Sequence, residues 1–365
     1  MKIGFFCFDN AGGDAMALLA KEAETRGHEV TLFPKQVRGL AKERGQELID
    51  LDAMVTGLSS FETEQELEFA DFCLKFQTPW FVFEDVPGAC LRPKAKDYWA
   101  YRAKLVFLAH PSGSEAAKEF GYDGTVYLGP PPQWRLEYES LMQAKAENWP
   151  RRKKLVEISG VSTEIGLSKN DRSVGLILGK EPEENNRIIK VVKEALAGMD
   201  ARGIVLVVGK HPGERPDPNK PGDEERFTQL FVERSKILED IWVANTNDTK
   251  IWKGARIAGS ADVMIYASGT NISIAGAYAR VPGIYLNDEG VRARVKIQTG
   301  GETWFVAELG GAVKASSRDQ LADAIQFLLT SAGQDRCCRQ QEKAFPLPDD
   351  WHTERKIIEF LEKVM

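Results

Sequence analysis

The chain has 365 residues, 43% of them hydrophobic and 28% charged, and its formal net charge is -6 at pH 7. This length favours two domains, and the acidic balance argues against a general nucleic-acid binder. Its five cysteines form no Cys-x-x-Cys pair and its four histidines are dispersed, so neither a disulfide framework nor a zinc centre is expected. No apolar run approaches ~18 residues, and the opening MKIGFFCFDN is too short for a signal peptide. We therefore expect no membrane-spanning helix and a cytoplasmic protein.

The first half of the chain alternates short apolar strands with helices. Strands are predicted at 2–8, 28–33, 53–56, 80–83, 105–109 and 126–128, and helices at 14–26, 39–51, 64–76, 98–102, 114–120 and 134–148. Buried strands separated by helices predict a parallel sheet that is covered on both faces. Gly129-Pro130-Pro131-Pro132 interrupts this pattern and a charged stretch follows the last helix, so the domain junction is placed between 150 and 172.

The second half repeats the alternation. Strands are predicted at 173–178, 203–208, 241–244, 263–266, 283–286 and 311–314, and helices at 184–197, 224–234, 249–258, 318–330 and 351–364. The predicted fold class is α/β, with two Rossmann-like, doubly wound parallel-sheet domains that face a cleft. The first domain comprises 1–160 together with the final helix, 350–365, which crosses back to it. The second comprises 161–349.

Turns after the second-domain strands carry residues that suit phosphate. Ser268-Gly269-Thr270 joins a strand to a helix, where backbone N–H groups and a hydroxyl favour an anion. Lys210 and His211 follow another strand and offer a charge and a hydrogen-bond donor. Lys180 is placed to reach a diphosphate, and Asn245 to meet a nucleotide base. The alternative is that these residues only form ordinary turns.

The turn after the first strand, Asp9-Asn10-Ala11-Gly12-Gly13-Asp14, predicts an acceptor- or sugar-binding segment through Asn10, Gly12, Gly13 and Asp14. Glycines there let a ligand approach the backbone closely. In the alternative interpretation the glycines only make a tight turn that Asp14 caps. The candidate general bases are Asp85, Glu84 and Asp9, with Asp85 or Glu84 favoured, provided that burial raises a carboxyl pKa toward neutrality. Solvated surface acids are the alternative.

In order of elements, the second half resembles the donor domain of GT-B-type glycosyltransferases. Lys210-His211-Pro212 is similar to the His-Pro element of capsule, teichoic-acid and polysialic-acid transferases, where it serves the nucleotide phosphate. The Asp9–Asp14 turn resembles that of lipid A disaccharide synthase, and Tyr127-Leu128-Gly129-Pro130-Pro131 is similar to the link that ends the first domain of that family. The resemblance implies a nucleotide-sugar glycosyltransferase, with UDP favoured by family frequency and CMP or CDP fitting equally well.

The chain departs from these families at three places. Ile274-Ala275-Gly276 stands where such donor domains carry a Glu that holds the donor ribose. Thr56-Gly57-Leu58-Ser59-Ser60 replaces an acidic residue of the synthase after the third strand, and Asn10 replaces the Glu of its first turn. The departures imply that the donor binds differently, that the base has moved, or that turnover has been lost.

The leading hypothesis is transfer of a sugar from a nucleotide-activated donor to an unknown acceptor, with no metal or other cofactor. The acceptor is a glycan, a lipid-linked sugar or, less favoured, modified DNA, and a homodimer is compatible with the sequence. The alternatives are a non-hydrolysing sugar-nucleotide 2-epimerase, a non-catalytic nucleotide- or glycan-binding protein, and a site for phosphate alone.

Overall fold

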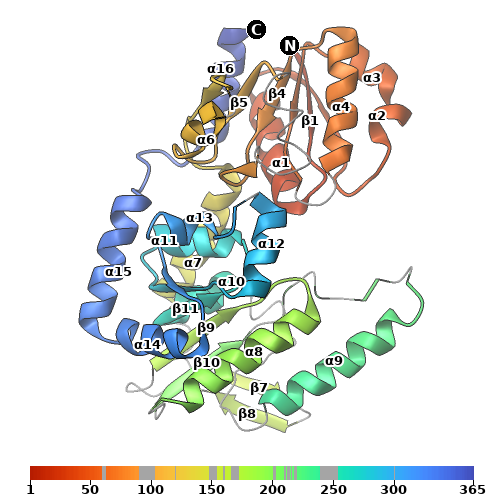
Figure 1. Cartoon of the computed structure of the whole chain (residues 1–365). Coiled ribbons are helices and arrows are strands. Elements are labelled where there is room, and N and C mark those ends of the chain that lie inside the picture. The colour runs from red at the N-terminus through yellow and green to blue at the C-terminus, as the bar shows by residue number, and fades with distance from the viewer. Residues whose placement is uncertain are drawn as a thin grey trace. The chain divides into compact units, whose positions relative to one another are not determined.

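The structure is a computed structural model in which the chain divides into two compact units (Figure 1). The N-terminal unit contains Met1–Leu136, Ala293–Glu302 and Pro348–Met365, and the C-terminal unit contains Glu137–Arg292 and Thr303–Leu347. The domain boundary expected at residue 160 thus falls inside the C-terminal unit. The structure describes residues 1–59, 63–89, 103–119, 121–147, 154–158, 161–165, 172–199, 203–208, 211, 214, 216–217, 220–238, 254–299 and 301–365.

The N-terminal unit is built on a parallel sheet with the strand order β2-β1-β3-β4-β5-β6. All its described strand pairs are parallel, with Phe5 opposite Leu32 on one side and Val55 on the other. The strands are β1 (Lys2–Phe6), β2 (Glu29–Leu32), β3 (Ala53–Thr56), β4 (Trp80–Phe83), β5 (Leu105–Phe107) and β6 (Thr125–Val126). β1, β3 and β4 consist almost entirely of buried apolar residues, as expected for strands that are covered on both faces.

Helices cover both faces of this sheet. One face packs against α1 (Asn10–Thr25), and the other against α2 (Leu40–Glu43), α3 (Gly45–Ile49) and α4 (Thr63–Phe76). On the second face Phe6 stacks on Phe69 of α4 with ring centroids 4.4 Å apart. The short α6 (Gly113–Glu119) lies between β5 and β6.

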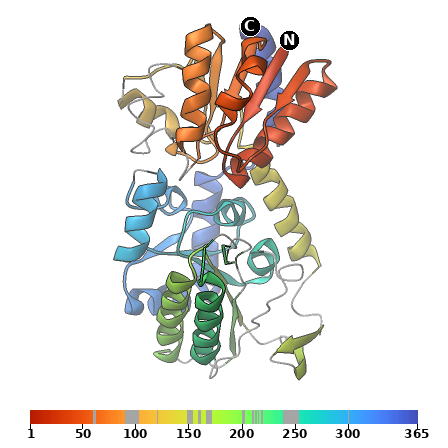
Figure 2. The ribbon, with the colours of Figure 1, turned by 90° about the vertical axis from the view of Figure 1, so that its right-hand side faces the viewer.

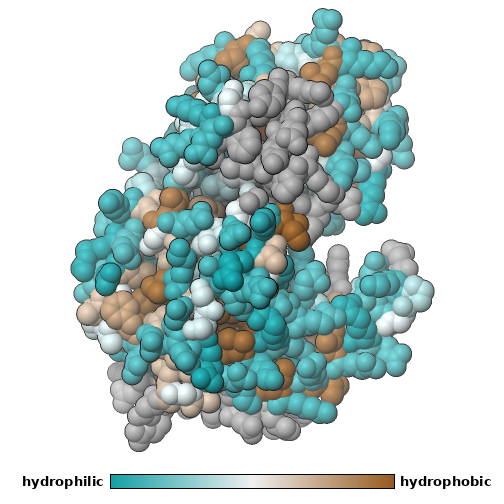
Figure 3. All heavy atoms as spheres, viewed as in Figure 1, coloured by the Kyte–Doolittle hydropathy of each residue, from teal (hydrophilic) through white to brown (hydrophobic). Residues whose placement is uncertain are grey.

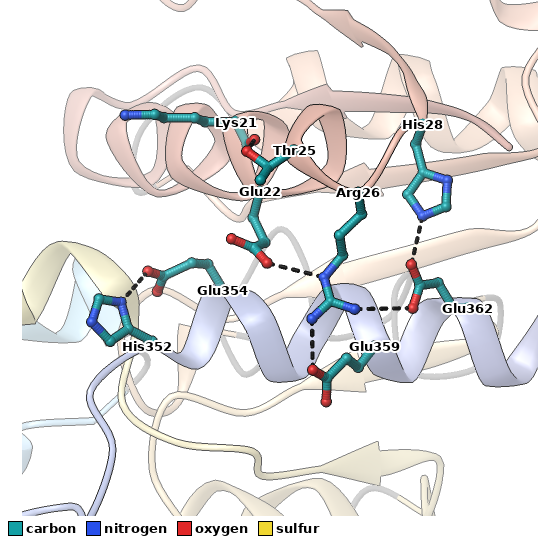
Figure 4. Close-up of polar contacts among 9 residues, drawn as sticks. All are labelled: Lys21, Glu22, Thr25, Arg26, His28, His352, Glu354, Glu359 and Glu362. Atoms are coloured by element: carbon teal, nitrogen blue, oxygen red, sulfur yellow. Dashed lines mark hydrogen bonds and ion pairs between the residues drawn. The ribbon is translucent and has the colours of Figure 1, made fainter.

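The final helix, α16 (Thr353–Val364), returns to the N-terminal unit, as the sequence predicts. Its apolar face buries Ile357, Ile358 and Leu361 in the same core cluster as α1. Arg26, at the end of α1, binds Glu359 at 2.6 Å and Glu362 at 3.2 Å (Figure 4). Burial of the apolar face supplies most of the stabilisation, while these partly exposed ion pairs contribute little and fix the register.

The C-terminal unit is built on a second parallel sheet, with the order β10-β9-β11-β12-β13. Its strands are β9 (Arg172–Ile177), β10 (Ile204–Val208), β11 (Val263–Tyr266), β12 (Gly283–Leu286) and β13 (Val313–Ala315). One row of helices contains α8 (Pro182–Ala197), α9 (Asp223–Leu238) and α14 (Arg318–Leu328), and another contains α10 (Gly254–Ser260), α11 (Asn271–Tyr278) and α15 (Ser331–Ala344). Figure 2 shows α8 and α9 side by side.

Several elements differ from the sequence prediction. The charged stretch expected at the domain junction contains an antiparallel strand pair, β7 (Lys154–Ile158) with β8 (Val161–Ile165). The helices α12 (Glu289–Thr299), α13 (Phe305–Glu308) and α15 were not predicted. The sequences of α12 and α15 are mostly polar, and α13 has only four residues, too few to show a helical period. The helix predicted at 134–148 is α7 (Pro132–Ala146). The helix predicted at 98–102, the strand at 241–244 and the start of the helix at 249–258 lie outside the described residues.

In the part of the chain that the structure describes, no helix combines the length and the apolar character needed to cross a membrane. Hydrophilic side chains dominate the surface of the C-terminal unit that is visible in Figure 3. The exposed large hydrophobic side chains are spread over both units.

Candidate functional site

Three of the turns predicted to bind phosphate follow neighbouring strands of the second sheet. Gly179 and Lys180 follow β9, His211 follows β10, and Ser268-Gly269-Thr270 follows β11 (Figure 1). Because β10, β9 and β11 are adjacent and parallel, their carboxyl ends lie at one edge of the sheet. The structure therefore brings these turns to the same edge. Lys210 and Asn245 lie outside the described residues.

The Ser268-Gly269-Thr270 turn is shaped by packing as well as by its place before α11. The Thr270 hydroxyl accepts a hydrogen bond from the Ile272 N–H at 3.0 Å and so caps the helix. A Cβ atom on Gly269 would lie 2.4 Å from the Trp304 ring, so this position requires glycine. The Trp304 indole in turn donates to the Ser273 hydroxyl at 2.9 Å. The turn is half-buried, and the cap already uses one of the amides that a phosphate would otherwise bind.

His211 is held in place by a buried ion pair. The Glu214 N–H donates to the His211 carbonyl at 2.9 Å, and the fully buried Glu214 carboxylate accepts from Arg234 of α9 at 3.1 Å. Burial lowers the pKa of His211, the nearby Lys180 charge lowers it further, and Glu214 opposes both effects. The lowered pKa favours the uncharged imidazole at neutral pH.

The Gly179–Lys180 turn is fixed by a side chain from the helix that follows it. Asn185, fully buried on α8, accepts from the Gly179 N–H at 3.0 Å and donates to the Gly179 carbonyl at 2.9 Å. Both polar groups of the glycine are thereby satisfied within the protein. Lys180 itself is exposed, and its charge acts on His211.

The positions that would carry the ribose-binding Glu belong to the core. Ile274 and Ala275 are fully buried, and a Cβ atom on Gly276 would lie 2.6 Å from the Met264 side chain. An acid at these positions would have to be accommodated in an apolar environment, which is costly without a partner. The absence of this acid therefore matches the local packing of α11.

The carboxyl edge of the first sheet is acidic. Asp9 follows β1, Glu84 and Asp85 follow β4, and Ser59 and His110 follow β3 and β5. These four strands are adjacent and parallel, so the residues gather at one edge of the sheet.

The residues expected to form a turn, Asp9–Asp14, instead begin a helix, so the alternative interpretation, in which Asp14 caps a Gly12-Gly13 turn, is wrong. The helix α1 begins at Asn10, Asp9 is its N-cap residue, and both glycines lie within its first turns. A Cβ atom on Gly12 would lie 2.3 Å from the Cys7 sulfur, so glycine lets α1 approach the end of β1 closely. Asp14 is exposed and pairs with Lys35 at 2.6 Å.

The three candidate bases differ in exposure. Glu84 is fully buried and accepts from the Ala109 N–H at 3.3 Å, and Asp85 is 5% exposed. Asp9 is half-buried, and its N–H donates to the Ser59 hydroxyl at 2.9 Å. Of these carboxylates, Asp9 is the one with the most access to a ligand.

Sequence reasoning missed a fourth acid at this edge, Glu66 of α4. It is fully buried, and its Oε1 accepts hydrogen bonds from the Phe8 N–H, at 2.9 Å, and from the Ser59 hydroxyl. Its Oε2 is buried and has no hydrogen-bond partner among the described residues. Burial raises the pKa of Glu66 from 4.5 to about 7, and the Asp9 charge adds to the effect.

A signal for Glu66 was present in the sequence. The buried face of α4 contains Thr63, Glu66, Phe69, Ala70 and Cys73, so the acid interrupts an apolar stripe at helical spacing. Asn185 interrupts the buried stripe of α8 in the same way. Polar residues in such a stripe are buried and need partners.

We expect Gly12→Ala to destabilise the protein by about 1–3 kcal/mol, because the new methyl group overlaps the Cys7 sulfur. The double variant Cys7→Ala/Gly12→Ala removes that sulfur and should recover much of the loss, with Cys7→Ala as the control. Denaturant unfolding of the wild type, the two single variants and the double variant measures the coupling free energy between positions 7 and 12. Additive effects of the two substitutions would show that this contact does not explain the glycine.

We expect Glu66 to make folding stability depend on pH. Below pH 4.5 it is protonated in both states, and as the pH rises toward 7 the unfolded chain loses the proton first. The raised pKa therefore lowers the free energy of unfolding by about 3 kcal/mol across this range. In Glu66→Gln this decrease in the free energy of unfolding should be absent, and in the exposed control Glu64→Gln it should remain. Denaturant unfolding between pH 4 and 8 measures both. A parallel pH dependence in Glu66→Gln and the wild type would contradict the assignment.

No protein-family model matches the chain, and no curated protein matches its sequence. Solved structures do match over nearly its whole length. UDP-GlcNAc 2-epimerase from Methanocaldococcus jannaschii has a TM-score of 0.63 at 12% identity, with 100% of each chain covered. MnaA from S. aureus, in a co-structure with UDP, has a TM-score of 0.65 at 12% identity, with 100% of this chain and 96% of that chain covered. MurG from Acinetobacter baumannii has a TM-score of 0.58 at 11% identity, with 99% of each chain covered.

These similarities confirm the predicted fold class, and the subfamily stays open. The chain has the GT-B fold, with two Rossmann-like parallel-sheet units and a final helix packed on the first.

Proposed function

We propose that the protein is a glycosyltransferase that takes a sugar from a nucleotide-activated donor, a UDP-sugar, and transfers it to an acceptor hydroxyl without a metal ion. The acceptor oxygen forms a bond to C1 of the sugar, the bond from C1 to the diphosphate breaks, and UDP leaves. A protein base takes the proton of the acceptor hydroxyl.

The observation that carries this proposal is the convergence of His211, Lys180 and the Ser268-Gly269-Thr270 turn at one edge of the second sheet. A neutral histidine, an ammonium group and the N-terminus of α11 all interact favourably with a diphosphate. Each interaction strengthens as negative charge develops on the leaving nucleotide, which is how such donors accelerate transfer. Lys210 and Asn245 are proposed as further donor ligands.

The acceptor side of the reaction is proposed for the acidic edge of the first sheet. Asp9 is the proposed base in place of Asp85 or Glu84, because both of those carboxylates are buried and Asp9 is the most exposed of the three candidates. Asp85 and Glu84 are then supporting acids. Carboxylates accept hydrogen bonds from sugar hydroxyls, and the exposed Asn10 adds an amide beside them. Gly12 lets α1 approach the end of β1, Gly13 lies against the Lys35 side chain, and Asp14 is proposed as an outer contact.

The structural neighbours agree with this choice of donor. The solved structures with similar folds include MnaA with UDP, at a TM-score of 0.65, and the M. jannaschii 2-epimerase with UDP-GlcNAc and UDP, at a TM-score of 0.62. UDP-GlcNAc is therefore the first donor to test.

A non-hydrolysing sugar-nucleotide 2-epimerase is the second candidate. The cluster of acids at the first sheet edge favours it, since epimerisation needs groups that remove and return protons around the sugar. A non-catalytic nucleotide-binding protein is the third, and it would bind UDP-GlcNAc without turning it over.

We expect His211→Ala to weaken UDP-GlcNAc binding by roughly 1–3 kcal/mol, because it removes a hydrogen bond to a charged group. Binding of the diphosphate should also raise the pKa of His211, so wild-type affinity should increase as the pH falls from 8 to 6, and this trend should vanish in His211→Ala. Titration calorimetry measures both effects, with His28→Ala of the N-terminal unit as the control. An unchanged dissociation constant in His211→Ala would remove this residue from the site.

The two enzyme functions are separated by incubating the protein with UDP-GlcNAc in D₂O. The proposed transferase should transfer the sugar slowly to water, which releases UDP. The C2 proton of the sugar should be retained, and EDTA should not change the rate. Proton NMR follows both the free UDP and the C2 proton signal. Loss of the C2 proton signal before UDP appears would establish the epimerase instead, and binding without either product would establish the third candidate.

A further inference from the structure

We propose that Glu66 and Ser59 act together as positioning residues that hold Asp9, the proposed base, at the start of α1. This inference rests on the proposed function for the role of Asp9, whereas the contacts that define the pair are independent of it. Neither residue is expected to touch the substrate.

The pair holds two successive backbone amides. The Phe8 N–H donates to Glu66 Oε1 at 2.9 Å, and the Asp9 N–H donates to the Ser59 hydroxyl at 2.9 Å. The Ser59 hydroxyl donates in turn to the same Glu66 oxygen. One buried carboxyl thus fixes, directly and through Ser59, the segment that joins β1 to α1.

These contacts hold the segment before α1 and differ from a conventional helix cap, in which a side chain accepts from an N–H of the first turn. The Asp9 side chain makes no capping hydrogen bond to α1, although Asp9 has the extended backbone of an N-cap residue, with φ -67° and ψ 149°. The Asp9 carboxylate is therefore not engaged in capping its own helix. The Asp9 backbone is instead held through its N–H, which donates to the Ser59 hydroxyl.

Glu66 suits this task because it is removed from solvent. It is fully buried on α4, and its second oxygen has no hydrogen-bond partner in the described residues. Burying a carboxyl group in this way costs free energy, and an apolar side chain would fill the same space without that cost. The acids that act on the same region are Asp9 and Asp85, both of which, like Glu66, raise the pKa of Cys7.

The test compares Glu66→Ala, Glu66→Gln and Ser59→Ala in the full-length protein, with Glu64→Ala on the exposed face of α4 as the control. The probe is UDP-GlcNAc. Measurements are its dissociation constant, the rate of UDP release, and amide hydrogen exchange at Phe8 and Asp9.

Glu66→Ala should lower the rate of UDP release at least tenfold and speed amide exchange at Phe8 and Asp9 at least tenfold, with the dissociation constant changed less than twofold. Glu66→Gln keeps an oxygen acceptor and should recover most of both effects, and Glu64→Ala should match the wild type. Ser59→Ala should speed exchange mainly at Asp9, which tests the pair even if Glu66→Ala does not fold.

Normal UDP release in a folded Glu66→Ala protein, or equal damage in Glu66→Gln and Glu66→Ala, would overturn the inference. A loss of UDP-GlcNAc affinity in Glu66→Ala as large as the loss in the rate of UDP release would also overturn it, because it would indicate general damage to the protein. If the wild type releases no UDP, the proposed function fails by itself, and the exchange rates at Phe8 and Asp9 still decide whether the pair holds this segment.

Discussion

Parallel strand pairing is the constraint on which the candidate site depends. In both large sheets every strand pair that the structure describes is parallel, so all carboxyl ends in a sheet lie along one edge. Residues that are far apart in sequence, such as Lys180 and Ser268, are collected there by topology alone. Each sheet therefore needs only suitable residues at its strand ends to build a site.

The two edges collect opposite kinds of chemistry. The first sheet brings together Asp9, Glu84, Asp85 and the buried Glu66, whereas the second brings together Lys180, a neutral His211 and the N-terminus of α11. Carboxylates suit hydroxyl groups and proton transfer, and cations with helix amides suit phosphate. This division of charge is the physical basis for proposing a sugar acceptor at one edge and a nucleotide diphosphate at the other.

Much of the fold could be predicted from the sequence. Apolar strands alternating with helices gave the strand-end positions of His211, Gly269 and Glu84, and the prolines at 346 and 348 marked the return of α16. The first turn was misjudged because Gly12-Gly13 suggests a turn, while the reason for glycine is the Cys7 sulfur, a contact between residues that only folding brings together. For the same reason Trp304 beneath Gly269 could not be foreseen. The roles of the site residues, and the cleft between the domains, stay predictions.

Glu66 illustrates the remaining limit. Its place in the apolar stripe of α4 signalled burial, but its partners Phe8 and Ser59 lie on other segments and depend on the register of β1 against β3. Hydrogen-bonded networks of this kind are set by tertiary structure and leave little trace in local sequence.

The most direct test of the account is a crystal structure of the protein with UDP-GlcNAc bound. The account predicts the diphosphate at the carboxyl edge of the second sheet, within hydrogen-bonding distance of His211 and of the Ser268-Gly269-Thr270 turn. A nucleotide bound away from both, on any other surface, would contradict it.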